Sequence, residues 1–249
     1  MLSFSIITCA WNSEPYISQC IASVHHQTYP QVEQIFVDGG SEDGTLERIK
    51  AVIRPSRWVT GIRGGISDAM NVGVEMAKGD VIAHLHSDDY YLGPDVLANV
   101  AAEMERTGAL WLFGRIVSDI DGQLVMPGWT MPAVTWAQLL RGNFIAHPAV
   151  FIRKDFYVRT GGFDKSLRYA MDYDLWLRLM RLAPPSYLDQ NLAAFRRHVG
   201  SISTTNAIEA FKEDHAVRKR YIEGGIINSC FHEVIYLRRL VRHRMRLRG

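Results

Sequence analysis

Residues 81–90 read Val-Ile-Ala-His-Leu-His-Ser-Asp-Asp-Tyr, an alternating apolar run that ends in two adjacent carboxylates. Asp is a poor strand former and neighbouring like charges repel, so fold stability gives little reason for this pair. Asp88 and Asp89 instead offer the oxygen ligands that Mg²⁺ or Mn²⁺ takes, and such an ion commonly bridges to a substrate's phosphates. The stretch therefore predicts a buried strand with a divalent-metal site at its tip.

Strand-like and helix-like segments alternate on the N-terminal side of this run. Their patterns predict strands at 3–8, 32–37 and 58–60, and helices at 13–26, 45–52 and 66–76. This βαβαβαβ order predicts a mostly parallel sheet with helices on its faces, and such sheets bind ligands beyond the carboxyl ends of their strands. Thr8, Asp38 and the Asp88-Asp89 pair all lie at those ends.

The second half of the chain is less regular. Its patterns predict a helix at 94–106, a strand at 109–113, hairpin strands at 115–118 and 123–126, and a helix at 172–180. The turn of the hairpin is Asp121-Gly122. No repeat, low-complexity tract or flexible linker separates the halves, so we expect them to be fused over one sheet.

The composition is that of a folded domain. At 249 residues and 47% hydrophobic content, the chain can bury a full core. Cys9, Cys20 and Cys230 have no metal-type spacing and suit reduced thiols in a cytosol. The N-terminus has no basic n-region, and no apolar run approaches the roughly 20 residues that cross a bilayer. We therefore expect a cytoplasmic protein whose contact with membranes is confined to their surface.

The C-terminal tail carries the basic character of the chain. Residues 215–249 hold nine Lys or Arg against Glu223 and Glu233, a charge of +7, whereas the remainder is −5. Apolar residues recur there at helical spacing: Phe231, Val234, Ile235, Val241 and Met245. A cationic, partly amphipathic helix of this kind is typical of binding to the inner face of the cell membrane, with a solvated or self-packing helix as the alternative. No nucleic-acid reader motif accompanies the charge, so nucleic acid is not an expected partner.

Four blocks, in the order in which they occur, resemble family 2 glycosyltransferases. They are Ser5–Asn12, Val37–Thr45, Gly65–Gly73 and Ser87–Asp89, and the likeness covers about residues 3–205. The resemblance implies an α/β GT-A fold, with a Rossmann-like, mostly parallel sheet flanked by helices, here followed by C-terminal basic helices. It also implies inverting transfer of a sugar from a nucleotide donor, expected to be UDP-linked, to a hydroxyl of a glycan or lipid-linked acceptor. Mn²⁺ or Mg²⁺ would be the cofactor, and bacterial surface-polysaccharide assembly would suit the activity.

The resemblance assigns the donor side of the site to the first three blocks. The residues are Thr8 and Ala10, at positions that contact the nucleotide; Asp38; Gly64 and Gly65; and Asp68 and Asn71, on one helical face toward the same cleft. Asp38 matches the acid that reads the base, typically uracil, although an Asp before two glycines also forms turns. Gly64 and Gly65 would let backbone approach a ligand closely, or form only a helix entry turn.

The metal site falls on the fourth block and on a late segment. By the resemblance, Asp89 is the direct ligand, and Asp88 contacts the ribose or reaches the ion through water. His198, in residues 195–203, would reach the metal or the diphosphate. His84 and His86 share one face of the strand, and we expect them to be structural histidines.

Inverting transfer also needs a base on the acceptor side, because a sugar hydroxyl is a weak nucleophile until its proton is removed. Asp172 is the candidate by the resemblance; the family's Glu-Asp pair reads Met171-Asp172 here. Asp174 is the rival, roughly 200° around the helix from Asp172, so both cannot face one cleft. Without the resemblance, Asp172 reads more simply as a helix N-cap.

The same resemblance divides the chain by role. Residues 1–98 form the nucleotide-sugar-binding half, 99–210 the acceptor-binding half, and 211–249 the basic helical tail. The glycine-rich turn at 160–164 would face both sugars, and the segment 143–148 with Phe151 would line the acceptor side.

Two other functions fit parts of the sequence. A nucleotidyltransferase also uses carboxylates and Mg²⁺, but it usually carries a glycine-rich, arginine-bearing signature where this chain has Thr8-Cys9-Ala10-Trp11-Asn12. A non-catalytic nucleotide-sugar-binding protein would explain the loss of the acid at Met171. Dinucleotide oxidoreduction has less support than either, because no G-x-G-x-x-G follows a predicted strand.

Overall fold

One nine-stranded sheet runs through the computed structural model of the chain, in the order β3-β2-β1-β4-β8-β6-β9-β5, with β7 paired to β6. The structure describes all residues except 53–55, 127, 129, 199–205, 224 and 247–249, and the side chains of 226–229, 231 and 242–246 are not described either. The strands are β1 (Phe4–Ala10), β2 (Val32–Asp38), β3 (Ser56–Val59), β4 (Val81–His84), β5 (Tyr90–Tyr91), β6 (Trp111–Ile120), β7 (Gln123–Val125), β8 (Val150–Arg153) and β9 (Ser186–Arg197).

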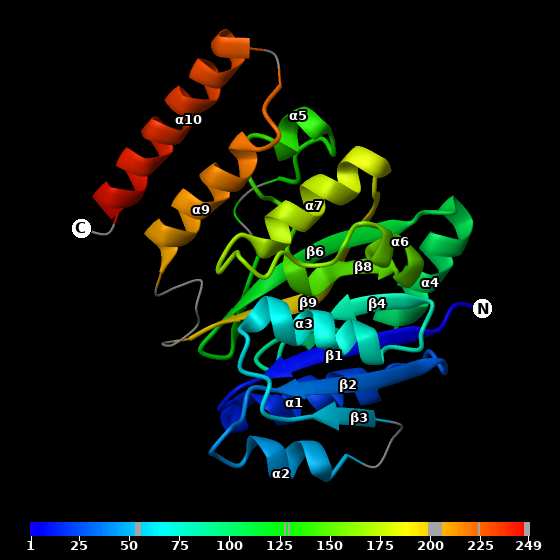
Figure 1. Cartoon of the computed structure of the whole chain (residues 1–249). Coiled ribbons are helices and arrows are strands. Elements are labelled where there is room, and N and C mark those ends of the chain that lie inside the picture. Colours follow the sequence, from blue (N-terminus) through cyan, green and yellow to red (C-terminus); the bar gives the residue numbers. More distant parts are fainter. Residues whose placement is uncertain (53–55, 127, 129, 199–205, 224, 247–249) are drawn as a thin grey trace.

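Helices cover both faces of this sheet. They are α1 (Glu14–His25), α2 (Thr45–Lys50), α3 (Ile66–Met76), α4 (Val96–Thr107), α5 (Trp136–Leu139), the 3-10 helix η1 (His147–Ala149), α6 (Lys154–Arg159), α7 (Met171–Leu182), α9 (Ala207–Lys219) and α10 (Gly225–Arg246). In Figure 1, α3, α6 and α7 lie in front of the sheet, α1 and α4 behind it, and α9 and α10 beyond α7.

Strand direction brings the ends of distant strands to one edge. The pairs β3-β2, β2-β1 and β1-β4 are parallel, whereas β8 runs antiparallel to both β4 and β6. Since β8 is antiparallel to both of its neighbours, β6 runs in the same direction as β4 and β1. β9 pairs with β6 in parallel and so runs in that direction too. The carboxyl ends of β1, β2, β4 and β9 therefore meet at the same edge. The predicted α/β architecture with a mostly parallel sheet is confirmed.

The core lies on both faces of the sheet, and large apolar side chains fill it. Trp111 of β6 stacks on Trp176 of α7 at 6.0 Å between ring centroids, beneath the front helices. On the other face, Phe4 of β1 meets Phe151 of β8 edge to face at 6.2 Å. These four rings are almost completely buried. Their burial fixes α7 and β8 against the sheet, and with them the second half of the chain.

The regular elements of the first half agree with their patterns, and α3 has the predicted bounds of 66–76. The hairpin at Asp121-Gly122 is also present; both residues have positive φ, 51° and 82°, as a type I′ turn requires. The predicted strands at 109–113 and 115–118 are wrong as separate elements, because they form the single strand β6. Gly114, between the two predicted strands, makes room for β9: a Cβ there would lie 2.4 Å from Leu192 Cδ1.

Two strands of the second half were not predicted. β9 contains the polar run Asp189-Gln190-Asn191, which hides its strand pattern, although its later residues 192–194 are buried. β8 has only four residues and was read as part of the acceptor lining. Both strands depend on pairing with β6, a contact between segments distant in sequence.

The tail forms two helices, as its pattern indicates, and they pack on each other. Tyr236 of α10 stacks on His215 of α9 with ring centroids 3.8 Å apart. Arg239 of α10 donates a hydrogen bond to the Arg141 carbonyl, which anchors α10 to the segment after α5. Among the described helices, none combines the length and the apolar content that crossing a membrane requires.

The close approach of α3 to β1 gives a test of this packing. A Cβ at Gly73 would lie 2.3 Å from Ile7 Cγ2, so Gly73→Ala should lower the free energy of unfolding by about 1–3 kcal/mol through overpacking. Urea denaturation measures the change. Gly93→Ala is the control, because a Cβ there meets nothing within 4 Å. Equal stability of the two variants would contradict this packing.

Candidate functional site

The acid at the end of β2 is held by hydrogen bonds. Asp38 is completely buried. Its carboxylate accepts hydrogen bonds from the Gly40 amide (2.9 Å), the Ser41 hydroxyl (2.5 Å) and the Thr60 hydroxyl (2.6 Å). Burial alone would raise the pKa of Asp38, but the hydrogen bonds from Ser41 and Thr60 outweigh it and hold the pKa below its usual value. Asp38 is therefore an ionised acceptor that orders the loop after β2.

An exposed aromatic ring borders this loop. Trp11 directly follows β1 and leaves 70% of its surface exposed. A Cβ built on Gly39 would lie 3.4 Å from Trp11 Cδ1, and one built on Gly40 would lie 3.4 Å from Arg63 Nη2. Trp11 and Arg63 thus flank the loop from two sides. Sequence reasoning missed both residues; the available signal was a Trp directly after a strand that ends at the ligand edge.

β1 buries the two predicted contact residues. The hydroxyl of Thr8 accepts a hydrogen bond from Gln34 Nε2 at 3.0 Å, and Thr8 has no exposed surface. Ala10 is also buried. The Thr8 side chain therefore supports the strand from inside, and a nucleotide contact at this position stays a prediction.

Residues at the start of α3 fix the backbone around them. Gly65 has φ 90° and precedes the helix, and a Cβ at Gly64 would lie 2.3 Å from Asp68 Oδ2. Asp68 forms an ion pair with Lys165. The two glycines make the helix entry turn, and Gly64 leaves room for the Asp68 carboxylate.

Asn71 connects the two halves of the chain. Its Nδ2 donates to the Phe163 carbonyl at 2.9 Å, and its Oδ1 accepts from the Phe163 amide (3.0 Å) and the Tyr157 hydroxyl (2.6 Å). Gly162, with φ 70°, lies against the same oxygen. The Asn71 side chain thus holds the glycine-rich turn at 160–164 in place, and its contribution to the donor site stays a prediction.

The two acids after β4 are unequal. Asp89 is only 2% exposed, and its Oδ1 accepts a hydrogen bond from the Arg196 amide at 3.0 Å. Burial, and next the charge of Asp88, raise the pKa of Asp89 well above its usual value. Asp88 is partly exposed, and its Oδ2 lies 3.1 Å from His198 Nε2. The more accessible oxygens are therefore those of Asp88, the reverse of the order that the sequence suggested.

β9 brings His198 to this position. The His198 ring packs against Tyr16 of α1 with centroids 4.5 Å apart. Arg196 lies over the same Tyr16 ring and pairs with Asp119 at 3.4 Å, so its charge is already neutralised within the fold. The remainder of the late segment, residues 199–203, lies outside the described residues.

The donors at this edge fit a hard divalent cation that also binds phosphate. Asp88 supplies carboxylate oxygens and His198 an imidazole nitrogen, a set that suits Mn²⁺ and, less closely, Mg²⁺. Within the described part of the chain, no group of three or more His, Cys, Asp or Glu is arranged to hold a metal alone. The residues therefore suit an ion that is completed by ligands from a bound diphosphate.

Three histidines with adjacent rings lie at the tip of β4, His84 buried and His86 and His147 partly buried. His86 stacks on His147 at 5.0 Å, and His84 lies 5.5 Å from His147. Burial lowers the pKa of all three, that of His84 to about 3, so the cluster is neutral at pH 7. The cluster joins the tip of β4 to the segment 143–148.

Asp172 and Asp174 occupy different environments at the start of α7. Asp172 is partly exposed and accepts hydrogen bonds from the Tyr173 amide (2.6 Å) and from Asn143 Nδ2 (3.2 Å). Burial raises the pKa of Asp172 to about 6. Asp174 is buried, pairs with Arg178 at 2.8 Å and accepts from the Tyr221 hydroxyl at 2.8 Å.

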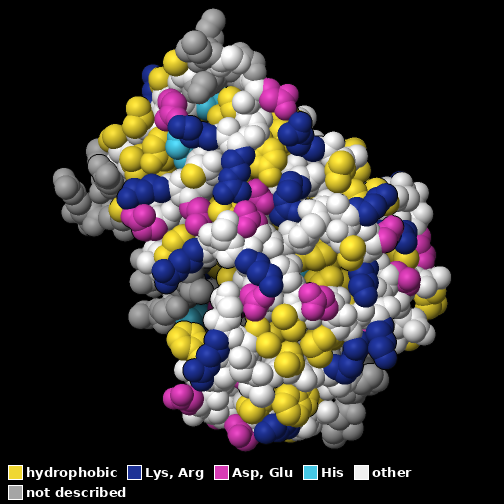
Figure 2. Space-filling view, viewed as in Figure 1, with side chains coloured by type: hydrophobic (Ala, Val, Ile, Leu, Met, Phe, Trp, Pro, Cys, Tyr) yellow, Lys and Arg dark blue, Asp and Glu magenta, His cyan; other side chains and the backbone are white. Residues whose placement is uncertain are grey.

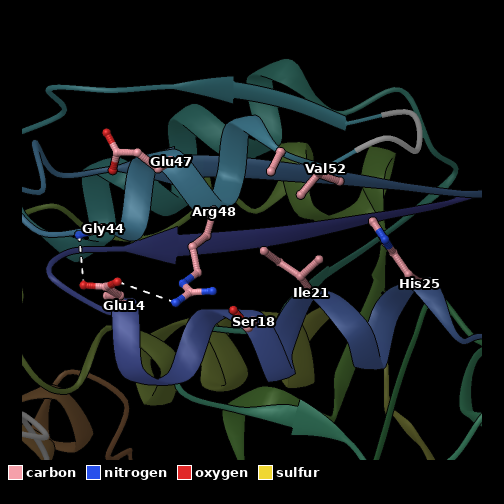
Figure 3. A pocket seen from close by; sticks show the side chains of 9 residues that line it. Glu14, Ser18, Ile21, His25, Gly44, Glu47, Arg48 and Val52 are labelled. Carbon is pink, nitrogen blue, oxygen red and sulfur yellow. Dashed lines mark hydrogen bonds and ion pairs between the residues drawn. The ribbon is translucent and has the colours of Figure 1, made fainter.

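A groove of about 750 Å³ lies elsewhere, between α1 and α2 (Figure 3). Glu14 binds the Gly44 amide and pairs with Arg48 across it. Its lining residues are Glu14, Ser18, Ile21, His25, Gly44, Glu47, Arg48, Ala51 and Val52. None of the predicted site residues is among them, so the groove is not the candidate site.

Several known proteins are similar in sequence to this chain over most of its length. The sequence model of glycosyl transferase family 2 matches residues 5–158. An uncharacterized glycosyltransferase of Mycobacterium tuberculosis is 30% identical over 89% of this chain and 86% of its own length. A chondroitin synthase and a hyaluronan synthase of Pasteurella multocida are 30% and 31% identical over 86% and 75% of the chain. The chain spans only 22% and 19% of the lengths of these two synthases.

Solved structures share the fold. TarS residues 1–349 of S. aureus, in complex with UDP-GlcNAc, has a TM-score of 0.70 at 19% identity over 86% of this chain and 66% of that one. The mannosyltransferase PcManGT of Pyrobaculum calidifontis, in complex with GDP-Man and Mn²⁺, has a TM-score of 0.70 at 15% identity over 94% of this chain and 68% of that one. The chain belongs to glycosyl transferase family 2 and has the GT-A fold of a glycosyltransferase.

Proposed function

We propose that the chain is a metal-dependent, inverting glycosyltransferase that moves a sugar from a UDP-linked donor to a hydroxyl of a glycan or lipid-linked acceptor. The observation that carries the proposal is that Asp38 ends β2 and that Asp88 and His198, 3.1 Å apart, follow β4 and β9 at the same carboxyl edge of the sheet. Parallel sheets bind nucleotides at this edge. The roles of the individual residues follow from their burial and partners.

The donor nucleotide would lie on the exposed face of Trp11, beside the loop after β2. The exposed Trp11 ring offers a face on which a base stacks, and a base–aromatic stack is worth about 1–3 kcal/mol. Asp38 is ionised and buried, so it would act on the base through the loop whose shape it fixes and not by direct contact. Arg63, at Gly40, supplies the positive charge nearest to that loop.

Asp88 and His198 would hold Mn²⁺ or Mg²⁺, which neutralises charge on the departing diphosphate. We assign Asp88 the direct contact because it is the more exposed acid, and Asp89 the task of joining the strand tip to β9. His198 is the second ligand.

Asp172 is the base in this proposal. Its pKa of about 6 leaves it ionised at pH 7 while it still binds a proton well, which general-base catalysis requires. Asn143 orients its carboxylate. Asp174 does not suit the role, because Arg178 and Tyr221 already occupy its oxygens.

These residue roles lead to a proposed function for each of three segments of the chain. Residues 1–98 would bind the nucleotide sugar, 99–210 the acceptor, and 211–249 would attach the enzyme to the inner face of the cell membrane. The names of two relatives, chondroitin synthase and hyaluronan synthase, support a role in bacterial polysaccharide synthesis.

The outer face of α10 is the proposed membrane contact. Val234, Leu237 and Val241 share one face of the helix and are 48%, 55% and 54% exposed, while Tyr236 on the opposite face packs on α9. Figure 2 shows hydrophobic side chains at the surface over α10, with Lys and Arg nearby. With the +7 charge of residues 215–249, this face is complementary to an anionic lipid surface.

Donor and metal binding test the proposal first. UDP should raise the melting temperature more with Mn²⁺ than without, and EDTA should remove the Mn²⁺-dependent part. Asp88→Asn should weaken Mn²⁺-dependent UDP binding roughly 10–100-fold by removing a ligand. Asp95→Asn, an exposed acid at the start of α4, is the control. Unchanged Mn²⁺ dependence in the Asp88 variant would contradict the metal assignment.

Substitutions of the two acids of α7 should have different effects: one should lower stability and the other should slow turnover. Asp174→Asn breaks a buried ion pair and should lower the free energy of unfolding by roughly 2–4 kcal/mol. Asp172→Asn should keep or raise stability at pH 8, because the folded pKa of Asp172 is raised, but should slow transfer at least about 100-fold. Urea denaturation and the rate of UDP release measure the two effects. If Asp174→Asn keeps wild-type stability and alone loses turnover, Asp174 is the base.

Vesicle flotation tests the membrane contact. The full chain should float with vesicles that contain phosphatidylglycerol and remain unbound with pure phosphatidylcholine. Changing Val234, Leu237 and Val241 to Ser should weaken binding roughly 100-fold, at about 1 kcal/mol for each partly inserted side chain. Val158→Ser with Leu182→Ser is the control, since both residues are exposed outside α10. Full binding by the triple variant would rule out this face.

A further inference from the structure

Helix α9 contacts the two segments of the chain that carry Asp172 and Asn143. On the side of Asp172, the carboxylate of Glu213 accepts hydrogen bonds from three consecutive amides that lead into α7. They belong to Arg168 (3.1 Å), Tyr169 (2.5 Å) and Ala170 (2.7 Å). Amides at a helix start lack partners within the helix, so this contact fixes α9 against the start of α7.

On the side of Asn143, Arg218 of α9 holds the preceding backbone. Its Nη1 donates a hydrogen bond to the Arg141 carbonyl at 3.0 Å. Arg239 of α10 donates to the same carbonyl oxygen, and a Cβ at Gly142 would lie 2.7 Å from the Arg239 Nη1. Two cationic side chains, one from each C-terminal helix, thus converge on one backbone oxygen two residues before Asn143.

His215 fixes the plane of the Arg218 guanidinium. Burial lowers the pKa of His215, so its ring is neutral at pH 7. Arginine can only donate, so His215 Nδ1, at 2.9 Å from Arg218 Nη2, is the acceptor. The other ring nitrogen, Nε2, then carries the hydrogen and donates it to Glu233 at 3.1 Å. The position and the orientation of the guanidinium are therefore both determined.

Stability alone does not explain the burial of Arg218. The residue is only 2% exposed, and among the described residues no carboxylate lies within ion-pair distance of its guanidinium. A buried cation of this kind costs free energy that an apolar side chain of similar volume would not. What the arginine supplies instead is a rigid planar group that donates two hydrogen bonds in fixed directions.

Asn143 connects this anchored backbone to the proposed base. Its Nδ2 donates to Asp172 Oδ2 at 3.2 Å, and its Oδ1 accepts from the Ile145 amide at 3.1 Å. Because Oδ1 is bound within its own turn, the plane of the side-chain amide follows the backbone of residues 141–145. A displacement of the Arg141 carbonyl would therefore move Asn143 Nδ2 away from Asp172.

We propose that Arg218 is a positioning residue for sugar transfer, which holds the turn at residues 141–143 so that Asn143 orients the Asp172 carboxylate. Glu213 of the same helix holds the start of α7, so α9 sets the spacing between the base and the amide that orients it. This inference rests on the proposed function, and it gives the C-terminal helices a task in the acceptor site in addition to membrane contact.

Other charged and titratable groups lie in the same region, and a test must separate their field from the effect of position. They are Asp172 and Tyr173 of α7, Glu213, Asp214, His215 and Arg218 of α9, Arg239 of α10, and Arg141 after α5. Arg218→Lys keeps the positive charge among these groups but removes the planar guanidinium, so it changes position and leaves the charge.

NMR of the side-chain amides, recorded on the full chain, tests the link without substrate. In the wild type, the Asn143 amide signals should shift as Asp172 ionises near pH 6. In Arg218→Lys they should no longer follow this titration, because the hydrogen bond to Asp172 is lost. Arg181→Lys, the same change at an exposed arginine of α7, should keep the wild-type response. A response that Arg218→Lys leaves unchanged, or its absence in the wild type, would overturn the proposal.

Arg218→Met separates positioning from a structural role. Methionine fills a similar space without a buried charge, so the melting temperature should stay close to that of the wild type. The Asn143 response to Asp172 should nevertheless disappear. A large loss of stability together with a preserved Asn143 response would mean a purely structural role and overturn the proposal.

A double-mutant cycle relates the turn to transfer. Arg218→Lys and Asn143→Ala should each lower kcat for UDP release roughly 10–100-fold through misplacement of the base, with the KM for the UDP-sugar unchanged. The double variant should be no slower than Asn143→Ala, because Arg218 acts through Asn143. Additive losses would contradict this order of action and overturn the role in transfer.

Failure of this inference differs from failure of the proposed function. A protein that transfers no sugar, but whose Asn143 signals follow Asp172 and lose that response in Arg218→Lys, would refute the proposed function and leave the arrangement of the turn intact. A protein that transfers sugar with unchanged kcat in Arg218→Lys would refute the positioning role alone.

Discussion

The hydrogen bond from the Arg196 amide to Asp89 joins the end of β9 to the tip of β4, two points 107 residues apart in the chain. It gives a buried carboxylate a partner, and without that partner the burial of Asp89 would cost several kcal/mol. It also carries His198 to within 3.1 Å of Asp88. The geometry of the donor edge therefore depends on a contact between the two halves of the sheet.

The three acids at this edge differ in their hydrogen-bond partners and in the accessibility of their oxygens. Asp38 is satisfied by the loop that follows it, and Asp89 by the backbone of β9. Asp88 keeps accessible oxygens and faces an imidazole. The site thus presents an accessible acid beside a histidine, and a diphosphate-bound cation can use these two side chains. The two acids of α7 differ in the same way: Asp174 is paired with Arg178, whereas Asp172 has no such ion pair among the described residues.

Local pattern predicted what depends on local sequence. The bounds of α3, the turn at Asp121-Gly122 and the acids at strand ends follow from periodicity and turn chemistry. The orientation of Thr8 did not, because it is set by Gln34 of β2. The inequality of Asp88 and Asp89 comes from β9, whose polar middle concealed the strand. Similarly, the sequence pattern placed Asn71 at the cleft, and it could not reveal the hydrogen bonds of its side chain with Tyr157 and Phe163.

The central claim is that this edge holds a nucleotide sugar for transfer to a hydroxyl. Mass spectrometry of products, after incubation with UDP-sugars, Mn²⁺ and a panel of oligosaccharide and lipid-linked acceptors, tests it most directly. The account predicts an acceptor heavier by one sugar residue, joined with inversion at the anomeric carbon, and one UDP released per transfer. Retention of configuration, or nucleotide transfer with release of pyrophosphate, would contradict it.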